Sequence, residues 1–183
     1  MMYKLIKHIL LFNLFLCSSL EAGQICKPDN IQASTPTNQF IDHANGTVTD
    51  KKTGLMWKKC SEGQSSNNCQ DGQLELFNFG KSLLHTQALN TNGGFAGFTD
   101  WRVPNIKELA SLKETQCLYP AINLQIFPNT YGYGRGYLSS TPYMRNEYYS
   151  NLTVWTVVPE SFSTIDQGKD ADDYYLRLVR TAE

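Results

Sequence analysis

Side chains able to catalyse a reaction are scarce in this 183-residue sequence. Outside the first 22 residues the only histidines are His43 and His85; neither lies in a recognisable catalytic motif, and there is no G-x-S-x-G. The sequence also lacks the C-x-x-C and H-E-x-x-H spacings that hold zinc. We therefore predict no catalytic residue, and no cofactor or metal site.

Residues 129–150 have a composition that favours ligand recognition. They include six of the ten tyrosines, interspersed with glycine and arginine. Tyrosine gives a stiff amphipathic surface, glycine lets a loop adapt its shape, and arginine donates directed hydrogen bonds. Long loops in compact domains are usually functional or disordered, and so many aromatic residues argue against disorder. The predicted ligand-binding residues are Tyr131, Tyr133, Arg135, Arg145, Tyr148 and Tyr149, whereas Tyr137 and Tyr143 are expected in the core.

Four cysteines, Cys26, Cys60, Cys69 and Cys117, follow the N-terminal region. An even number in an exported chain indicates two disulfides, for which three pairings exist. The polar stretch SEGQSSNN makes a closable loop between Cys60 and Cys69, so we favour that pair, which leaves Cys26 for Cys117.

The first 22 residues have the form of a secretory signal peptide. Basic residues precede a short apolar run, which is below the roughly 20 residues that span a bilayer, and cleavage after Ala22 fits best. A lipoprotein anchor at Cys17 is the weaker alternative, because Leu16 stands where a small residue is expected. Removing Lys4, Lys7 and Glu21 with the signal changes 16 basic and 17 acidic residues to 14 and 16. We expect a secreted, periplasmic or cell-surface protein with no remaining membrane span and no nucleic-acid partner.

After an extended arm at residues 23–39, one domain over residues 40–183 is predicted to be α+β. Asn45-Gly46 predicts a β-hairpin at residues 40–50, followed by a strand at 54–60. Further strands are expected at residues 151–158 and 174–180.

Two helices are predicted between these strands. Apolar residues at helical spacing indicate an amphipathic helix from Gln73 to Asn90, with the inward face Leu76, Phe77, Leu83, Leu84, Ala88 and Leu89. A second helix lies within residues 103–112, where Asn105 and Glu108 have the spacing of a capping box.

Five ordered blocks resemble the Lcl C-terminal domain family, named for the C-terminal module of bacterial collagen-like adhesins. The blocks are NGTVTDKKTGLMWKKC, GFTDWRVPNIKELASL, YLSSTPY, VWTVV and YLRLVR, and the resemblance covers residues 40–180. It implies a C-type-lectin-like fold, also found in formylglycine-generating enzymes, with two helices packed on a twisted antiparallel sheet. Two features depart from the family: Leu138 replaces a usual Trp, and no collagen-like Gly-X-Y repeat precedes the domain.

The implied fold gives structural roles to residues that could otherwise suggest a site. Trp101 would be a core anchor, and Arg102 would pair with a carboxylate such as Glu108 rather than clamp an anion. Trp57 and Trp155, in similar blocks, are expected to be buried as well. Lectins of this class often bind calcium, and an acidic cluster in this sequence is the candidate site. The cluster lacks the alternating ligand order of a calcium loop, so we interpret it as a solvated turn. The cluster consists of Asp166, Asp170, Asp172 and Asp173.

We therefore expect an exported recognition or adhesion module that binds a glycan, a polysaccharide or a surface protein. One alternative is an envelope enzyme related to the formylglycine-generating oxidases, which would need a free cysteine. Another is a passive, oligomeric subunit of a surface assembly.

Overall fold

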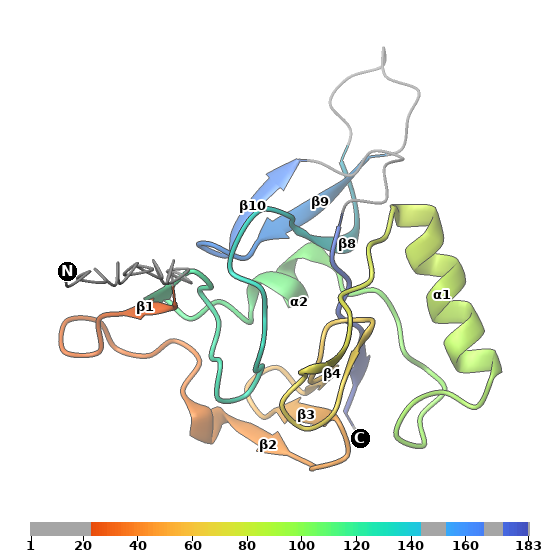
Figure 1. Cartoon of the computed structure of the whole chain (residues 1–183), viewed down its shortest axis with the longest axis horizontal. Helices are drawn as coiled ribbons and strands as arrows, with labels where there is room; N and C mark the ends of the chain where they lie inside the picture. Colours follow the sequence, from red (N-terminus) through yellow and green to blue (C-terminus); the bar gives the residue numbers. More distant parts are fainter. Residues whose placement is uncertain (1–22, 144–152, 167–173, 183) are drawn as a thin grey trace, which may run out of the picture.

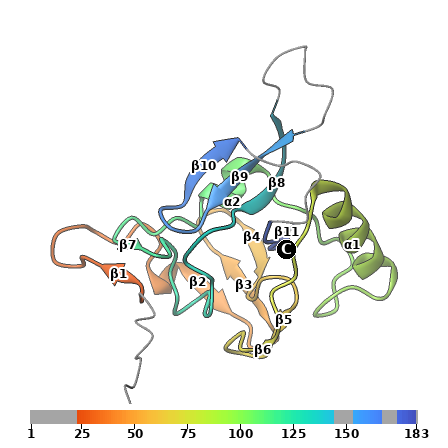
Figure 2. The same cartoon turned by 45° about the horizontal axis from the view of Figure 1, so that its top comes forward.

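The computed structural model describes residues 23–143, 153–166 and 174–182. Two larger antiparallel sheets, two two-stranded sheets and two α-helices form the regular structure of these residues (Figures 1 and 2). The strands are β1 (Ile25–Cys26), β2 (Phe40–Asp42), β3 (Thr47–Asp50), β4 (Leu55–Lys58), β5 (Gln64–Ser65), β6 (Asp71–Gly72), β7 (Cys117–Leu118), β8 (Tyr137–Tyr143), β9 (Thr153–Val158), β10 (Ser163–Asp166) and β11 (Val179–Thr181). The helices are α1 (Phe79–Thr91), α2 (Ile106–Ala110) and the short 3-10 turn η1 (Thr37–Gln39). The predicted α+β class is confirmed.

The larger sheet has four strands in the order β11-β4-β3-β2. Its β2–β3 hairpin turns at Asn45-Gly46, as the sequence predicts, and pairs Phe40 with Asp50. Gly46 has a φ of 85°, and a Cβ there would lie 2.7 Å from the ring of Phe95. Glycine is therefore required both by the turn and by the close approach of the phenylalanine.

The smaller sheet has the order β10-β9-β8, and α2 packs against all three of its strands (Figure 2). The predicted capping box begins α2: the Asn105 side chain accepts from the Glu108 amide, and Glu108 accepts from the Asn105 amide. Arg102 donates to both Glu108 oxygens at 2.7 and 2.8 Å, which confirms the predicted pairing. This carboxylate joins the entry of α2 to the segment before it.

Helix α1 differs from its prediction in both start and orientation. Residues 73–78 are extended, because the amides of Gln73, Glu75 and Phe77 donate to backbone carbonyls of the 62–63 turn and Tyr174. Asn78 then caps the helix by accepting from the Lys81 amide. The helix turns Ser82 and Thr86 inward, whereas Leu83 and Leu84 are exposed. Ala88 is exposed as well, so the predicted apolar inward face is wrong for Leu83, Leu84 and Ala88.

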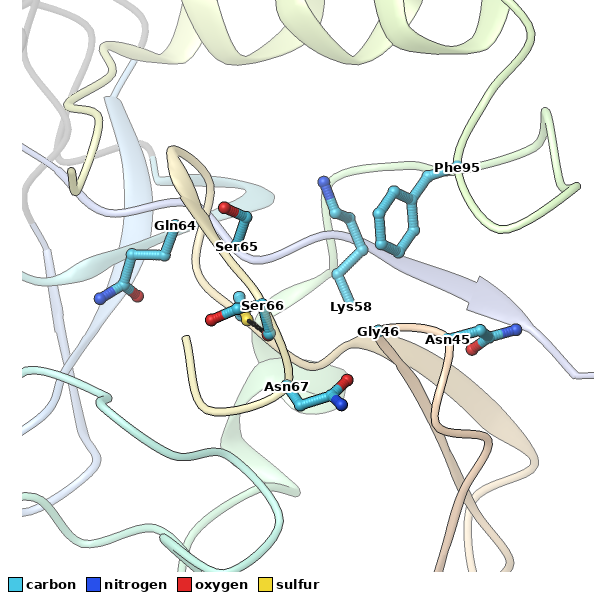
Figure 3. A pocket seen from close by; sticks show the side chains of 9 residues that line it. Asn45, Gly46, Lys58, Gln64, Ser65, Ser66, Asn67 and Phe95 are labelled. Carbon is cyan, nitrogen blue, oxygen red and sulfur yellow. Dashed lines mark hydrogen bonds between the residues drawn. The ribbon is translucent and has the colours of Figure 1, made fainter. Parts of the chain in front are cut away.

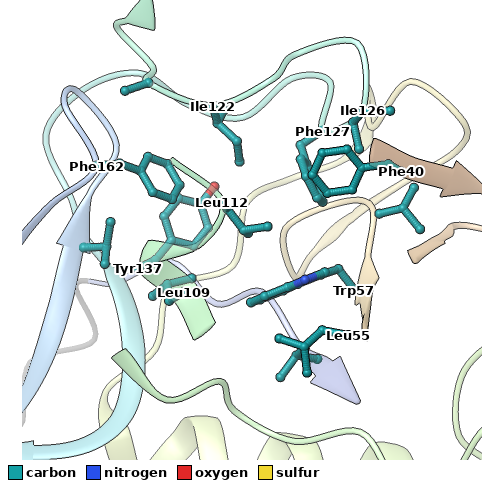
Figure 4. Close-up of a cluster of buried hydrophobic side chains, with 14 of the residues drawn as sticks. Phe40, Leu55, Trp57, Leu109, Leu112, Ile122, Ile126, Phe127, Tyr137 and Phe162 are labelled. Carbon is teal, nitrogen blue, oxygen red and sulfur yellow. The ribbon is translucent and has the colours of Figure 1, made fainter. Parts of the chain in front are cut away.

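The main core lies between the larger sheet, α2 and the 121–127 segment (Figure 4). Trp57 is fully buried in this core, which also contains Leu55, Leu109 and Phe127. The rings of Phe40 and Phe127 pack in a T-shaped arrangement, with their centroids 5.6 Å apart. A second cluster surrounds Trp101 and reaches β8 and β9. Trp57 and Trp101 are buried as predicted, whereas Trp155 is only partly buried, with its ring against Tyr143.

Both predicted disulfides are present, Cys60–Cys69 and Cys26–Cys117. The second joins β1 to β7 and so attaches residues 23–39 to the domain. Glu114 strengthens this attachment by accepting hydrogen bonds from the amides of Ser34 and Thr35. No helix among the described residues is long and apolar enough to cross a membrane. Residues 1–22, interpreted as a signal peptide, lie outside the described residues.

We predict that acid destabilises the domain through its hydrogen-bonded carboxylates. Burial by itself would raise the pKa of Glu108, but hydrogen bonds from Arg102 and the Asn105 amide outweigh it, so the pKa lies below the ordinary 4.5. For Glu114 burial is likewise outweighed, by amide hydrogen bonds from Gln116, Thr35 and Ser34. A lowered folded-state pKa stabilises the protein above the unfolded value, and this contribution disappears as the pH falls through the folded value.

The free energy of unfolding should therefore be constant near neutral pH and fall steadily below about pH 4.5. Urea unfolding measured at a series of pH values tests this, and Glu108→Gln should reduce the slope below pH 4.5. A free energy that stays constant down to pH 3 would contradict the assignment.

Candidate functional site

The first half of the predicted ligand-binding segment is exposed. Tyr131 and Tyr133 are 53% and 38% exposed, and Arg135 is exposed beside them. Gly136 and Tyr137 then turn inward as β8 begins. Arg145, Tyr148 and Tyr149, also predicted to bind ligand, lie outside the described residues, so their role remains a prediction.

Tyr133 stacks on Tyr119, which is not among the predicted ligand-binding residues. Their ring centroids are 5.1 Å apart and the planes differ by 19°. The chain can approach this closely because Gly132 lies against the backbone of Tyr119 and Pro120, where a Cβ would come within 2.7 Å of the Tyr119 carbonyl carbon. Two segments of chain thus present one stacked aromatic pair.

Tyr131 packs against Tyr175 in a T-shaped arrangement, with the ring centroids 6.1 Å apart. Burial, followed by the neighbouring phenols of Tyr137 and Tyr131, raises the pKa of Tyr175 to about 12. Tyr175 therefore stays neutral at any physiological pH. We call the surface formed by Tyr119, Tyr131 and Tyr133 the tyrosine platform.

Glu160 fixes the loop that carries this platform. Its Oε1 accepts from the Gly134 amide at 2.6 Å, and its backbone carbonyl accepts from the Tyr119 amide at 2.9 Å. One residue therefore holds both aromatic segments in place. The Oε2 atom of Glu160 is buried without a hydrogen-bond partner among the described residues.

Arg177 lies beneath the platform and is fully buried. Its guanidinium donates to the carbonyls of Lys58 and Lys59, to Ser61 Oγ at 3.2 Å and to Thr130 Oγ1 at 2.9 Å. It also lies over the rings of Phe127 and Tyr137, at 5.0 and 5.6 Å. Within the described ranges no carboxylate pairs with it, so neutral acceptors and aromatic faces solvate this charge.

The two histidines lie in unrelated settings. His43 Nε2 contacts Thr49 Oγ1 at 2.8 Å on the exposed hairpin. His85 Nε2 contacts Glu62 Oε2 at 2.8 Å, and Lys58 approaches the other oxygen at 2.7 Å. Burial would raise the pKa of Glu62, but the His85 hydrogen bond and the charge of Lys58 outweigh it and lower the pKa. The contacts among Lys58, Glu62 and His85 connect α1 to β4 and to the loop that the Cys60–Cys69 disulfide closes.

Residues 23–143, 153–166 and 174–182 contain no group of three or more His, Cys, Asp or Glu side chains that could hold a metal ion. Of the acidic cluster considered for calcium, Asp170, Asp172 and Asp173 lie outside these ranges. The solvated-turn interpretation of that cluster stays a prediction.

Comparison with known proteins identifies the family. The sequence model of the Lcl C-terminal domain matches residues 46–180, which is most of the chain. No curated protein and no solved structure matches the chain. The C-type-lectin-like relation of the fold therefore stays a prediction, whereas the ordered sequence blocks and the family match agree over residues 46–180. The protein belongs to the Lcl C-terminal domain family.

Proposed function

We propose that the protein is an exported, surface-associated recognition module that binds a glycan through the tyrosine platform. The family suggests a surface-associated role, and two disulfides suit an oxidising compartment outside the cytoplasm. The observation that carries the proposal is the exposure of Tyr131 and Tyr133 on a loop that Glu160, Gly132 and Tyr175 hold in one shape.

A fixed aromatic surface suits a ligand with flat apolar faces and polar edges. Sugar rings have this form: their C–H faces stack on aromatic rings, and their hydroxyl groups exchange hydrogen bonds at the rim. The platform has polar groups nearby, since Arg135 and Glu160 belong to the same loop system. Because these side chains are already ordered, binding costs little conformational entropy.

We expect the double substitution Tyr131→Ala/Tyr133→Ala to abolish glycan binding and to leave folding largely intact. Exposed side chains contribute little to stability, whereas aromatic anchors commonly contribute 2 kcal/mol or more to binding, about a 30-fold change in Kd. The wild type and the variant, both beginning at residue 23, would be compared on a glycan array and by thermal unfolding.

Leu84→Ala on the outer face of α1 is the matched control, because Leu84 is 67% exposed and lies outside the platform. It should bind like the wild type. Retained binding in the tyrosine variant would remove the platform from consideration, and a large loss of melting temperature would return these tyrosines to a structural role.

A surface protein is the second candidate ligand. Two exposed apolar residues favour it: Ile25 on β1 and its cross-strand partner Leu118 on β7, which are 55% and 45% exposed. Leu118 directly precedes Tyr119 of the platform. Exposed apolar side chains beside aromatic ones are typical of protein interfaces. A pull-down that depends on Leu118 but not on added sugar would favour this ligand.

The enzyme and assembly alternatives have direct tests of their own. Cysteine-based oxidase chemistry requires a thiolate, and the four described cysteines form the two disulfides. Thiol titration of the unreduced protein would detect a reactive cysteine and so support the enzyme. Solution mass tests the assembly subunit.

A further inference from the structure

A pocket of about 250 Å³ lies between the loop that the Cys60–Cys69 disulfide closes and the β2–β3 turn (Figure 3). It is lined by Asn45, Gly46, Lys58, Cys60, Gln64, Ser65, Ser66, Asn67 and Phe95. Three separate segments thus contribute: the β2–β3 turn, the residues between β4 and β6, and the loop after α1. The volume is below the roughly 300–1,000 Å³ of sites for drug-sized ligands, so it suits one small chemical unit.

We propose that this pocket binds a single neutral sugar unit. The inference deepens the proposed function, since it assigns a ligand class to a second position on the recognition surface. Gln64 connects the two positions: it lines the pocket, and its Nε2 donates to the Asn129 carbonyl, two residues before Tyr131.

The charges beside the pocket are already compensated. Lys58 lies 2.7 Å from a buried Glu62 oxygen, and the neighbouring Lys59 lies 2.6 Å from Asp42. A sulfate, phosphate or carboxylate ligand would therefore gain no unpaired cation here, while it would lose its hydration. A ligand without charge avoids that desolvation penalty.

The polar groups at the pocket suit hydroxyls. Asn45 Oδ1 accepts from the Thr47 amide and hydroxyl, which leaves its amide nitrogen to donate. Asn67 and Ser65 make no side-chain hydrogen bond to any described residue. Carboxamides and hydroxyls both donate and accept, and so do the hydroxyl groups of a sugar.

Phe95 supplies the apolar wall of the pocket (Figure 3). Its carbonyl accepts from Trp101 Nε1 at 3.0 Å, and the Lys58 ammonium lies 4.4 Å from its ring centroid. Gly46 allows the ring to rest on the hairpin backbone. On the opposite side, the disulfide and the β5–β6 pairing hold the loop that carries Ser65 and Asn67. The pocket is therefore preformed, which lowers the entropic cost of binding.

The test uses nuclear magnetic resonance of the isotope-labelled chain beginning at residue 23. The probes are the methyl glycosides of glucose, galactose, mannose and N-acetylglucosamine at millimolar concentration, with inorganic sulfate as the anionic probe. We expect at least one glycoside to shift the side-chain amide signals of Asn45 and Asn67 and the ring signals of Phe95. Sulfate should leave them unchanged.

Asn67→Ala should weaken that binding roughly two- to tenfold, the range for one lost hydrogen bond. The matched control is Gln70→Ala, since Gln70 is an exposed residue of the same loop and its side chain accepts from Asn68, which does not line the pocket. An equal loss in the control would overturn the proposal, because it would indicate a general effect on the loop. A preference for sulfate, or no shift with any of the four sugars, would overturn it as well.

The platform variant Tyr131→Ala/Tyr133→Ala separates this inference from the proposed function. It should lose array binding and keep the pocket shifts. If glycosides shift the pocket signals but the tyrosine variant keeps its array binding, the result supports the pocket and not the platform. If the variant loses array binding but no glycoside shifts the pocket signals of the wild type, the result supports the platform and overturns the pocket.

Discussion

Replacing Trp101 with alanine should lower the free energy of unfolding by about 3–5 kcal/mol, the usual range for a buried aromatic residue. Trp101 is 2% exposed, and its backbone amide and carbonyl both bond to the Asn90 side chain, at 3.1 and 2.8 Å. Its indole nitrogen donates to the Phe95 carbonyl. The substitution therefore leaves a cavity in the second core cluster. It also removes one of the two hydrogen bonds that the Phe95 carbonyl accepts, the other being from the Phe98 amide. Chemical denaturation followed by circular dichroism measures the loss.

Trp155→Ala is the natural control for this change. Trp155 is only partly buried, so its removal should cost less than that of Trp101. If Trp101→Ala kept the melting temperature and lost only ligand binding, Trp101 would instead be a binding residue.

Removing the Cys26–Cys117 disulfide should cost more stability than removing Cys60–Cys69. The partners are 91 and 9 residues apart. In the chain-entropy model these separations correspond to about 4.6 and 2.6 kcal/mol, because the longer loop restricts the unfolded chain more. The double variants Cys26→Ala/Cys117→Ala and Cys60→Ala/Cys69→Ala would be compared by urea unfolding.

Residues 23–39 should keep their position in the folded protein when the Cys26–Cys117 disulfide is removed. Gln24 donates to the carbonyls of Pro120 and Ile122, each at 2.7 Å, and Glu114 holds Ser34 and Thr35. The cost should thus arise mainly in the unfolded state. Equal losses in the two double variants, or a larger loss for Cys60/Cys69, would contradict this explanation.

Local sequence patterns were sufficient to predict several parts of the fold. Asn45-Gly46 specifies its hairpin through backbone conformation, and Asn105 with Glu108 specifies the start of α2 through two reciprocal hydrogen bonds. The Cys60–Cys69 pair follows from a short polar loop. In each case the interacting residues lie within ten positions of one another, so a local sequence pattern is enough to predict the interaction.

Helix α1 shows why periodicity can mislead. Leu83 and Leu84 supported an apolar inward face, but the capping by Asn78 and the extended residues before it determine where the helix begins and how it is rotated. Those extended residues form backbone bonds with the 62–63 turn and with Tyr174. Tertiary hydrogen bonds therefore override the local pattern.

The candidate site was predictable only in part, for the same reason. Composition identified Tyr131 and Tyr133, because they occur in one aromatic segment. Tyr119 and Glu160 complete the platform from other parts of the chain. The pocket likewise combines Asn45, Asn67 and Phe95, none of which the sequence pattern indicates as a binding residue.

The buried guanidinium of Arg177 has a consequence for the size of ligand that the domain can distinguish. It bonds to Ser61, within the loop that contributes to the pocket, and to Thr130, which directly precedes Tyr131 of the platform. The spacing between the two surfaces is thus set by a rigid planar group in the core, and not by a flexible connection. A polymer that contacts both surfaces must therefore span a constant distance between them. The domain would then discriminate between polymers by the repeat distance along the chain, in addition to the identity of each unit.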